Sequence, residues 1–141
     1  MNKQIIVHTD GASRGNPGPA AIGFIIEGLD EKPIERARRI GQTTNNQAEY
    51  AALEAALTQL QEREIDGYEV TILTDSQLMA HQLNGLYRVK NADLRPVFER
   101  VKEAIRLLNR QNSLTVSAIL REQNQQADRL ANLALDGHQL V

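Results

Sequence analysis

The sequence of 141 residues contains no cysteine and no tryptophan. Without cysteine the chain can form neither disulfides nor iron–sulfur clusters, and it suits a reducing compartment. No segment approaches the roughly 20 apolar residues that a membrane-spanning helix needs. The N-terminal residues MNKQIIVHTD enter a strand pattern at once, without the apolar core of a secretion signal. We therefore expect a cytoplasmic protein with no membrane partner.

Excess positive charge is also missing. The formal net charge is −2 and the pI is about 5.9, so the chain lacks the basic field of a protein that binds nucleic acid by charge alone. Basic residues do gather at positions 36–39 and between Arg88 and Arg110. A solvated helix face that includes Glu99 and Glu103 also explains the second group.

Hydrophobic periodicity predicts strands alternating with helices. The strands are expected at residues 5–9, 20–27, 34–42, 70–74 and 114–120, and the helices at 47–62, 76–83, 93–109 and 125–135. Three hairpin-linked strands followed by strands separated by helices indicate an α/β fold, with a mixed sheet covered by helices on both faces. We expect one domain over residues 1–141, with 136–141 as a C-terminal tail, acting as a monomer.

Two acidic residues are predicted at strand ends. Asp10 follows the first strand and opens the segment DGASRGNPGP, and Asp75 follows the fourth strand. Taken alone, Asp10 suits an Asp-Gly turn, and Asp75 with Ser76 suits a helix N-cap. If a right-handed crossover makes these strands parallel neighbours, both carboxylates open on one crevice.

Two further acidic residues are predicted near helix starts. Glu49 stands three residues after Asn46, as in a capping box. It also lies on the apolar helix face with Leu53, where an unpaired carboxylate is costly. Asp128, in the first turn of the last helix, could simply complement the helix dipole.

Considered together, these four carboxylates can converge on one crevice. Such a cluster repels itself unless it is protonated or neutralised by cations. Mg²⁺ prefers carboxylate oxygens, and the chain has no cysteine or histidine cluster for a softer metal. Two such ions can activate a water and stabilise the leaving oxygen at a phosphodiester, so the pattern predicts metal-dependent phosphodiester hydrolysis.

The chain resembles type 1 ribonuclease H in four separated motifs. They read TDGASRGNPGPAAIGF, TTNNQAEYAALEAAL, LTDSQL and REQNQQADRLANLA, and they follow one another over nearly the whole chain. The resemblance implies a five-stranded mixed sheet flanked by helices and hydrolysis of the RNA strand of RNA/DNA hybrids. It implies a cofactor of Mg²⁺, with Mn²⁺ as a substitute, and two ions when substrate is bound. By motif, the catalytic and metal-binding carboxylates are Asp10, Glu49, Asp75 and Asp128.

The resemblance also implies a surface that reads the minor groove of the hybrid. Backbone and amide groups there suit the 2′-hydroxyl of RNA, which is both donor and acceptor. Glycines would let the backbone approach the substrate, and Thr44 could help hold a phosphate of the DNA strand. Capping or turn formation is the alternative for the asparagines. The substrate-binding residues implied are Gly11, Ala12, Ser13, Gly15, Asn16, Thr44, Asn45, Asn46, Gln47, Ser76 and Asn124.

This chain departs from well-known members of that family in two places. Residues 121–126 replace a longer loop. In those members this loop carries a histidine that assists proton movement or product release. Glu122 and the tail are the two candidates here to replace that histidine. Residues 83–93 replace a basic protrusion, so we expect a compact form that binds the hybrid weakly and salt-sensitively. Tyr87, Arg88 and Lys90 could give a smaller contact with the DNA strand.

Two other functions fit parts of this pattern. Junction resolvases and exonucleases share the carboxylate layout, although the GNPGP and TNN segments argue against them. A non-catalytic module that binds hybrids is the second alternative. The presence of all four carboxylates argues against it, because binding alone does not need negative charge near phosphates.

Overall fold

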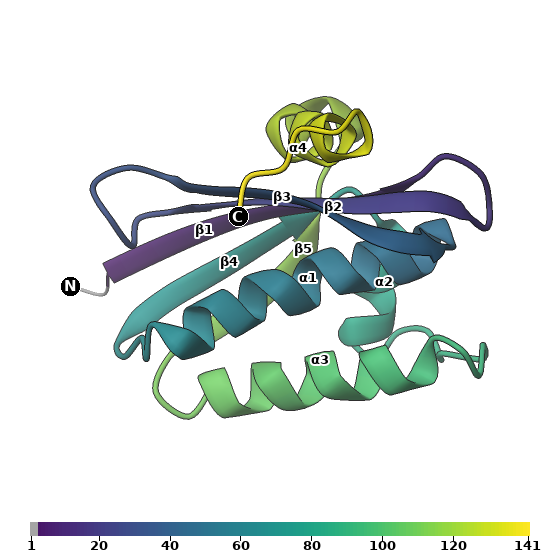
Figure 1. Cartoon of the computed structure of the whole chain (residues 1–141). Coiled ribbons are helices and arrows are strands. Elements are labelled where there is room, and N and C mark those ends of the chain that lie inside the picture. The colour runs from purple at the N-terminus through teal and green to yellow at the C-terminus, as the bar shows by residue number, and fades with distance from the viewer. Residues whose placement is uncertain (1–2) are drawn as a thin grey trace.

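The computed structural model describes residues 3–141, which form a sheet with helices on both faces (Figure 1). The strands are β1 (Lys3–Ser13), β2 (Gly18–Glu27), β3 (Ile34–Thr43), β4 (Tyr68–Thr74) and β5 (Ser113–Ala118). The helices are α1 (Asn45–Glu62), α2 (Gln77–Leu83), α3 (Arg95–Leu108), the short 3₁₀ helix η1 (Arg121–Gln123) and α4 (Gln125–Leu135). The predicted α/β fold is confirmed, with every predicted strand and helix present.

The sheet is mixed and has the strand order β3-β2-β1-β4-β5. β1, β2 and β3 pair antiparallel through two hairpins, whereas β4 pairs parallel with both β1 and β5. This confirms that the first and fourth strands are parallel neighbours. It also places β3 at an edge of the sheet, as its mixture of charged and apolar residues predicts.

The helices divide between the two faces of the sheet. α1 covers one face and α3 lies beyond it, while α4 lies alone on the other face (Figure 1). The α1 side holds the larger apolar core, in which Ile5 and Val7 of β1 pack with Leu53 and Leu57 of α1. The α4 side is smaller and includes Leu130 and Ala134. Within residues 3–141, no helix has both the length and the apolar character to span a membrane.

β1 is longer than its apolar run predicts. The strand continues through Asp10 to Ser13, so the segment DGAS is paired with β2 and only the residues after it form the turn. The prediction that Asp10 ends the strand was therefore wrong for the pairing with β2. The sequence pattern did not indicate the longer strand, because Asp and Gly are rare inside strands and common in turns.

Of the two suggested helix caps, the capping box at α1 was wrong and the cap of α2 is confirmed through Ser76. Thr44 caps α1, since its hydroxyl accepts the Gln47 backbone N–H, and the proposed capping box of Asn46 and Glu49 does not form. Ser76 caps α2 by accepting the Met79 N–H. Neither Glu49 nor Asp75 therefore caps a helix with its side chain, so capping does not explain these two carboxylates.

The C-terminal residues lie along the outer edge of β3. The backbone N–H and carbonyl of Leu140 pair with those of Ala37, both at 2.8 Å. The Gln139 side chain accepts the Arg39 backbone N–H at 2.8 Å. The tail therefore covers part of a strand edge that would otherwise be open.

Candidate metal centre

Asp10 and Asp75 lie side by side where β1 and β4 stop pairing. Thr9 and Thr74 are the last partners in the parallel register of these strands, and each acidic residue comes next in its chain. Asp10 is 5% exposed, while Asp75 is half-buried. The carboxyl ends of these neighbouring parallel strands therefore carry one carboxylate each, as predicted.

Glu49 reaches this position from α1. The Gly11 backbone N–H donates to Glu49 Oε1 at 2.6 Å. A Cβ on Gly11 would lie 2.1 Å from the carbonyl carbon of Ala48, so only glycine lets α1 come this close to β1. Glycine at position 11 is thus needed for the approach of a helix, and its predicted approach to substrate stays a prediction.

Asp128 reaches the same position from the opposite face of the sheet. Gly23 of β2 is the antiparallel partner of Asp10. A Cβ on Gly23 would lie 2.6 Å from the Ala127 carbonyl oxygen of α4. The missing side chain therefore lets the first turn of α4 approach the sheet next to Asp10, and this turn carries Asp128.

The structure thus gathers carboxylates from distant parts of the sequence. One oxygen from each of Asp10, Glu49 and Asp75 lies within 4.8 Å of the others. Asp128 is exposed beside them and lies close enough to raise the pKa of Asp10. The predicted convergence is confirmed, although the chemical roles of these residues remain predictions.

Burial and mutual repulsion make the charged forms costly. Burial, together with the charges of Glu49 and Asp75, raises the pKa of Asp10 to about 9. Burial raises the pKa of Glu49 to about 8, against the opposing effect of the Gly11 N–H bond. Without a cation, protons would have to neutralise this cluster at neutral pH.

Within the described part of the chain, no basic side chain forms an ion pair with this cluster. The four ion pairs within residues 3–141 join other acidic residues, namely Asp30, Glu54, Glu103 and Asp136. Crowded oxygen ligands, partial burial and the lack of a basic partner are the conditions under which a hard divalent ion binds carboxylates. Asp10, Glu49 and Asp75 therefore fit such an ion, with Asp128 at its margin.

A polar surface borders the carboxylates and joins the β1–β2 hairpin to the start of α1. Asn45 links the two, because its Oδ1 accepts the Ser13 N–H at 3.0 Å and its N–H donates to Asn16 Oδ1 at 3.0 Å. Asn16, Asn45 and Asn46 are all exposed. Within the described chain, their Nδ2 groups donate to no protein acceptor, so these donors face outward.

The other predicted substrate-binding residues take several positions around this surface. Ala12 and the exposed Gly15 belong to the β1–β2 hairpin. Thr44 and Ser76 use their hydroxyls as helix caps. Gln47 Oε1 accepts the Thr43 hydroxyl, and Gln47 Nε2 donates to the Asp93 carbonyl at 3.5 Å.

Asn124 does not fit its predicted contact with substrate. Its side chain is 1% exposed, and its Nδ2 donates to the Thr9 carbonyl at 2.9 Å. Sequence reasoning also missed Gly23 and Asn132, whose Nδ2 donates to the carbonyl and Oδ1 of Asp128 at 3.0 and 3.3 Å. A lone glycine inside a strand was the available signal for Gly23, and the i,i+4 spacing from Asp128 was the signal for Asn132.

The two departures from the expected family pattern are visible in the structure. Glu122 is exposed in η1, shortly after the Ile119 N–H bonds the Thr74 carbonyl at 2.8 Å. The link between α2 and α3, residues 84–94, contains no further helix. Arg88 and Lys90 are exposed there, and the Tyr87 ring packs edge-on against His81.

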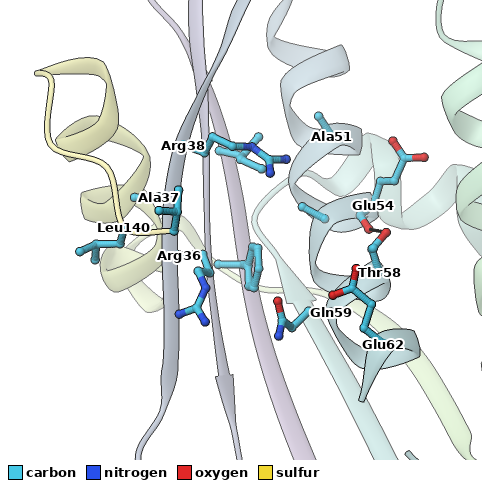
Figure 2. A pocket seen from close by; sticks show the side chains of 13 residues that line it. Arg36, Ala37, Arg38, Ala51, Glu54, Thr58, Gln59, Glu62 and Leu140 are labelled. Carbon is cyan, nitrogen blue, oxygen red and sulfur yellow. Dashed lines mark hydrogen bonds between the residues drawn. The ribbon is translucent and has the colours of Figure 1, made fainter. Parts of the chain in front are cut away.

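A groove of about 410 Å³ lies elsewhere, between β3 and α1. Figure 2 shows Arg36 and Arg38 on one wall and Glu54 and Glu62 on the other, with Leu140 of the tail at the β3 side. None of the four clustered carboxylates lines it. The clustered carboxylates therefore lie outside this groove.

Comparison with known proteins agrees with this arrangement. A family model described as RNase H matches residues 2–136. Ribonuclease HI of Halobacterium salinarum is 40% identical over 134 residues, which cover 94% of this chain and 65% of that protein. The bifunctional protein Rv2228c of Mycobacterium tuberculosis is 35% identical over 135 residues, covering 94% of this chain and 36% of its own length. The chain thus spans less than two thirds of these curated relatives.

Solved structures give the same result. The crystal structure of RNase H1 from Halobacterium salinarum superposes with a TM-score of 0.83 at 40% identity, covering 94% of this chain and 98% of that one. LC11-RNase H1, solved in complex with an RNA/DNA hybrid, superposes with a TM-score of 0.84 at 39% identity, covering 94% and 96%. At this identity the likeness extends from the fold to the sequence.

Proposed function

Because the chain belongs to the type 1 ribonuclease H family, we propose that it hydrolyses the RNA strand of RNA/DNA hybrids as an endonuclease. Mg²⁺ is the proposed cofactor, with Mn²⁺ as a substitute. The observation that carries the proposal is one oxygen from each of three carboxylates within 4.8 Å of the others, bordered by outward-facing asparagine amides. Residues 1–141 are proposed to act as one catalytic domain and as a monomer.

Asp10, Glu49, Asp75 and Asp128 are proposed to hold two divalent ions when substrate is bound. Such ions, when bound, activate a water for attack on the phosphodiester and neutralise charge on the leaving oxygen. The contribution of the chain is geometric. Neighbouring strands and helices on opposite faces hold the carboxylates in place before substrate arrives, so little reorganisation accompanies the reaction.

The bordering polar surface is proposed to select RNA. Asn16, Asn45 and Asn46 offer amide N–H donors at the surface, where the 2′-hydroxyls of a hybrid lie along its wide minor groove. The bonds among Asn45, Ser13 and Asn16 hold the hairpin and the start of α1 in one unit. This rigidity favours recognition by fixed donors over recognition by charge, as expected for a chain with net charge −2.

A strand-labelled substrate panel tests the proposal. The purified protein is given an RNA/DNA hybrid, single-stranded RNA, duplex RNA, duplex DNA and a four-way junction, each with Mg²⁺, Mn²⁺ or EDTA. We expect loss of the RNA strand of the hybrid alone, dependent on the metal. Asp10→Asn should abolish it, while Asp66→Asn, a matched change at an exposed aspartate outside the cluster, should leave it intact.

The same panel separates the alternatives. Cleavage of the junction or of duplex DNA would favour the resolvase or exonuclease alternative. Binding of the hybrid without metal-dependent cleavage would favour the non-catalytic module. Cleavage that survives Asp10→Asn would contradict the assignment of the carboxylate cluster.

A further inference from the structure

Asn124 connects the strand that carries Asp10 with the helix that carries Asp128. Its side-chain Nδ2 donates to the carbonyl of Thr9, the residue before Asp10, at 2.9 Å. Its own backbone carbonyl accepts the N–H of Asp128 at 3.1 Å. One buried residue is therefore hydrogen-bonded both to the residue before Asp10 and to the backbone of Asp128.

The other directional contacts of α4 lie at its C-terminal end, away from Asp128. There Arg39 Nε donates to the Ala134 carbonyl at 3.0 Å, and Arg14 pairs with Asp136 at 2.7 Å. Leu130 and Ala134 pack α4 on the sheet through apolar contacts, and the missing side chain of Gly23 sets how closely it can approach. Dispersion and burial are non-directional, so they hold the distance of a helix from a sheet better than its position along its own axis. A short hydrogen bond is directional and fixes that position.

Asp128 is held from its other side as well. Asn132, one turn later in α4, donates to the carbonyl and to Oδ1 of Asp128. The Asp128 carboxyl is thereby oriented within the helix, while the helix itself is positioned by Asn124. Asn132 acts within α4. Among residues 3–141, the Asn124 amide therefore makes the one side-chain hydrogen bond between the start of α4 and β1.

We propose that Asn124 is a positioning residue that sets the place of Asp128 relative to Asp10, and so sets the affinity of the carboxylate cluster for divalent cations. This inference rests on the proposed function, because it assumes that the cluster binds such ions. Groups that orient metal ligands without touching the metal typically change metal affinity or activity about 10–100-fold when removed. Because Asn124 is only 1% exposed, we expect it not to contact substrate, so its effect should appear in metal affinity and kcat and not in KM.

The first test measures Mg²⁺ and Mn²⁺ binding without substrate, from the rise in thermal midpoint as metal is added. Asn124→Ala should weaken the apparent affinity roughly 10-fold or more. Asn112→Ala is the matched control, because the Asn112 amide donates to the Ile65 and Leu108 carbonyls at 3.1 and 3.0 Å and lies outside the cluster. It should lower the thermal midpoint but leave the metal affinity unchanged.

The second test is a double-mutant cycle on kcat with saturating hybrid. If Asn124 acts through Asp128, Asn124→Ala should lower kcat in the wild type but change it less than about twofold in an Asp128→Asn background. Asn112→Ala should have the same effect in both backgrounds. If Asn124→Ala does not fold, Asn124→Ser takes its place, since serine is a favoured N-cap residue but its side chain is too short to replace the amide.

The outcomes separate the inference from the function on which it rests. Wild-type metal affinity in Asn124→Ala, or independent effects of Asn124 and Asp128 on kcat, would overturn the positioning role. A wild-type protein that binds Mg²⁺ but does not cleave the hybrid would contradict the proposed function. In that case the affinity measurements would still decide whether Asn124 positions Asp128.

Discussion

Asp10 and Asp75 occupy equivalent places on two parallel neighbours, each one residue beyond the Thr9–Thr74 pair that ends their shared register. Because the strands are parallel, β1 and β4 run in the same direction at this point, and the two carboxylates lie next to each other at the same edge of the sheet. β1 then continues alone with β2, while β4 leaves the sheet toward α2. The departure of β4 opens the space in which the carboxylates gather.

Removal of metal should make the stability of the protein fall as pH rises. Asp10 and Glu49 have raised pKa values of about 9 and about 8 in the folded state, so between about pH 4 and pH 8–9 the folded chain keeps protons that the unfolded chain loses. Each proton so held costs up to about 1.4 kcal/mol of stability per pH unit. The stability that these protonated carboxyls contribute is fully present below their pKa in the unfolded chain. It is lost as the pH rises through their pKa in the folded chain.

Thermal unfolding in EDTA and in Mg²⁺, from pH 5 to pH 8, checks this. The stabilisation by Mg²⁺ should grow with pH, because the ion replaces protons that become harder to keep. Asp10→Asn should unfold at a higher temperature than the wild type in EDTA at pH 8, with a smaller difference at pH 5. A variant less stable than the wild type at pH 8 without metal would contradict the raised pKa.

Gly23→Ala should impair the centre although Gly23 carries no functional group. Its Cβ would lie 2.6 Å from the Ala127 carbonyl oxygen and 2.7 Å from the Ala131 nitrogen, so α4 must move outward and take Asp128 with it. Overpacking of this kind costs about 1–3 kcal/mol. We expect a lower thermal midpoint and a higher Mg²⁺ concentration for half-maximal activity, measured together.

Ala21→Gly, on the same strand and also facing the α4 side, is the companion variant. It should lower stability without pushing α4 outward, and the metal requirement should stay as in the wild type. If Gly23→Ala and Ala21→Gly need the same Mg²⁺ concentration for half-maximal activity, the close approach of α4 is not needed.

Most of this architecture was predictable from sequence, and the exceptions have physical causes. Apolar periodicity located the five strands and the four α-helices, because burial of one face dominates their stability. The end of β1, the cap of α1 and the burial of Asn124 were not predictable. Asp, Asn, Ser and Gly all favour turns and caps locally. Whether one of them instead lies in a strand or is buried depends on tertiary contacts, such as those of Gly11, Gly23 and Thr9.

Hybrid binding should be weak and strongly dependent on salt. The compact link between α2 and α3 leaves Arg88 and Lys90 as exposed basic residues near Tyr87, and each phosphate contact adds about 0.9 to the salt slope of binding. Replacing both by alanine should reduce the slope by about 2. Lys32→Ala, in the β2–β3 turn, should leave it unchanged, as measured with Asp10→Asn protein to prevent cleavage. Tight binding at high salt would refute this prediction.

The tail and Glu122 are the two candidates for the task of the absent loop histidine, and the geometry separates them. Leu140 pairs with Ala37, Ala37 with Gly23 and Gly23 with Asp10, so three strand spacings of about 4.8 Å each lie between this part of the tail and the cluster. Glu122 instead follows the segment that bonds Thr74, next to Asp75. Truncation after Asp136 should therefore lower stability by about 1–2 kcal/mol through its lost backbone bonds and change kcat less than twofold. Glu122→Gln should lower kcat more than the truncation does while leaving the thermal midpoint unchanged, and the reverse order would assign the task to the tail.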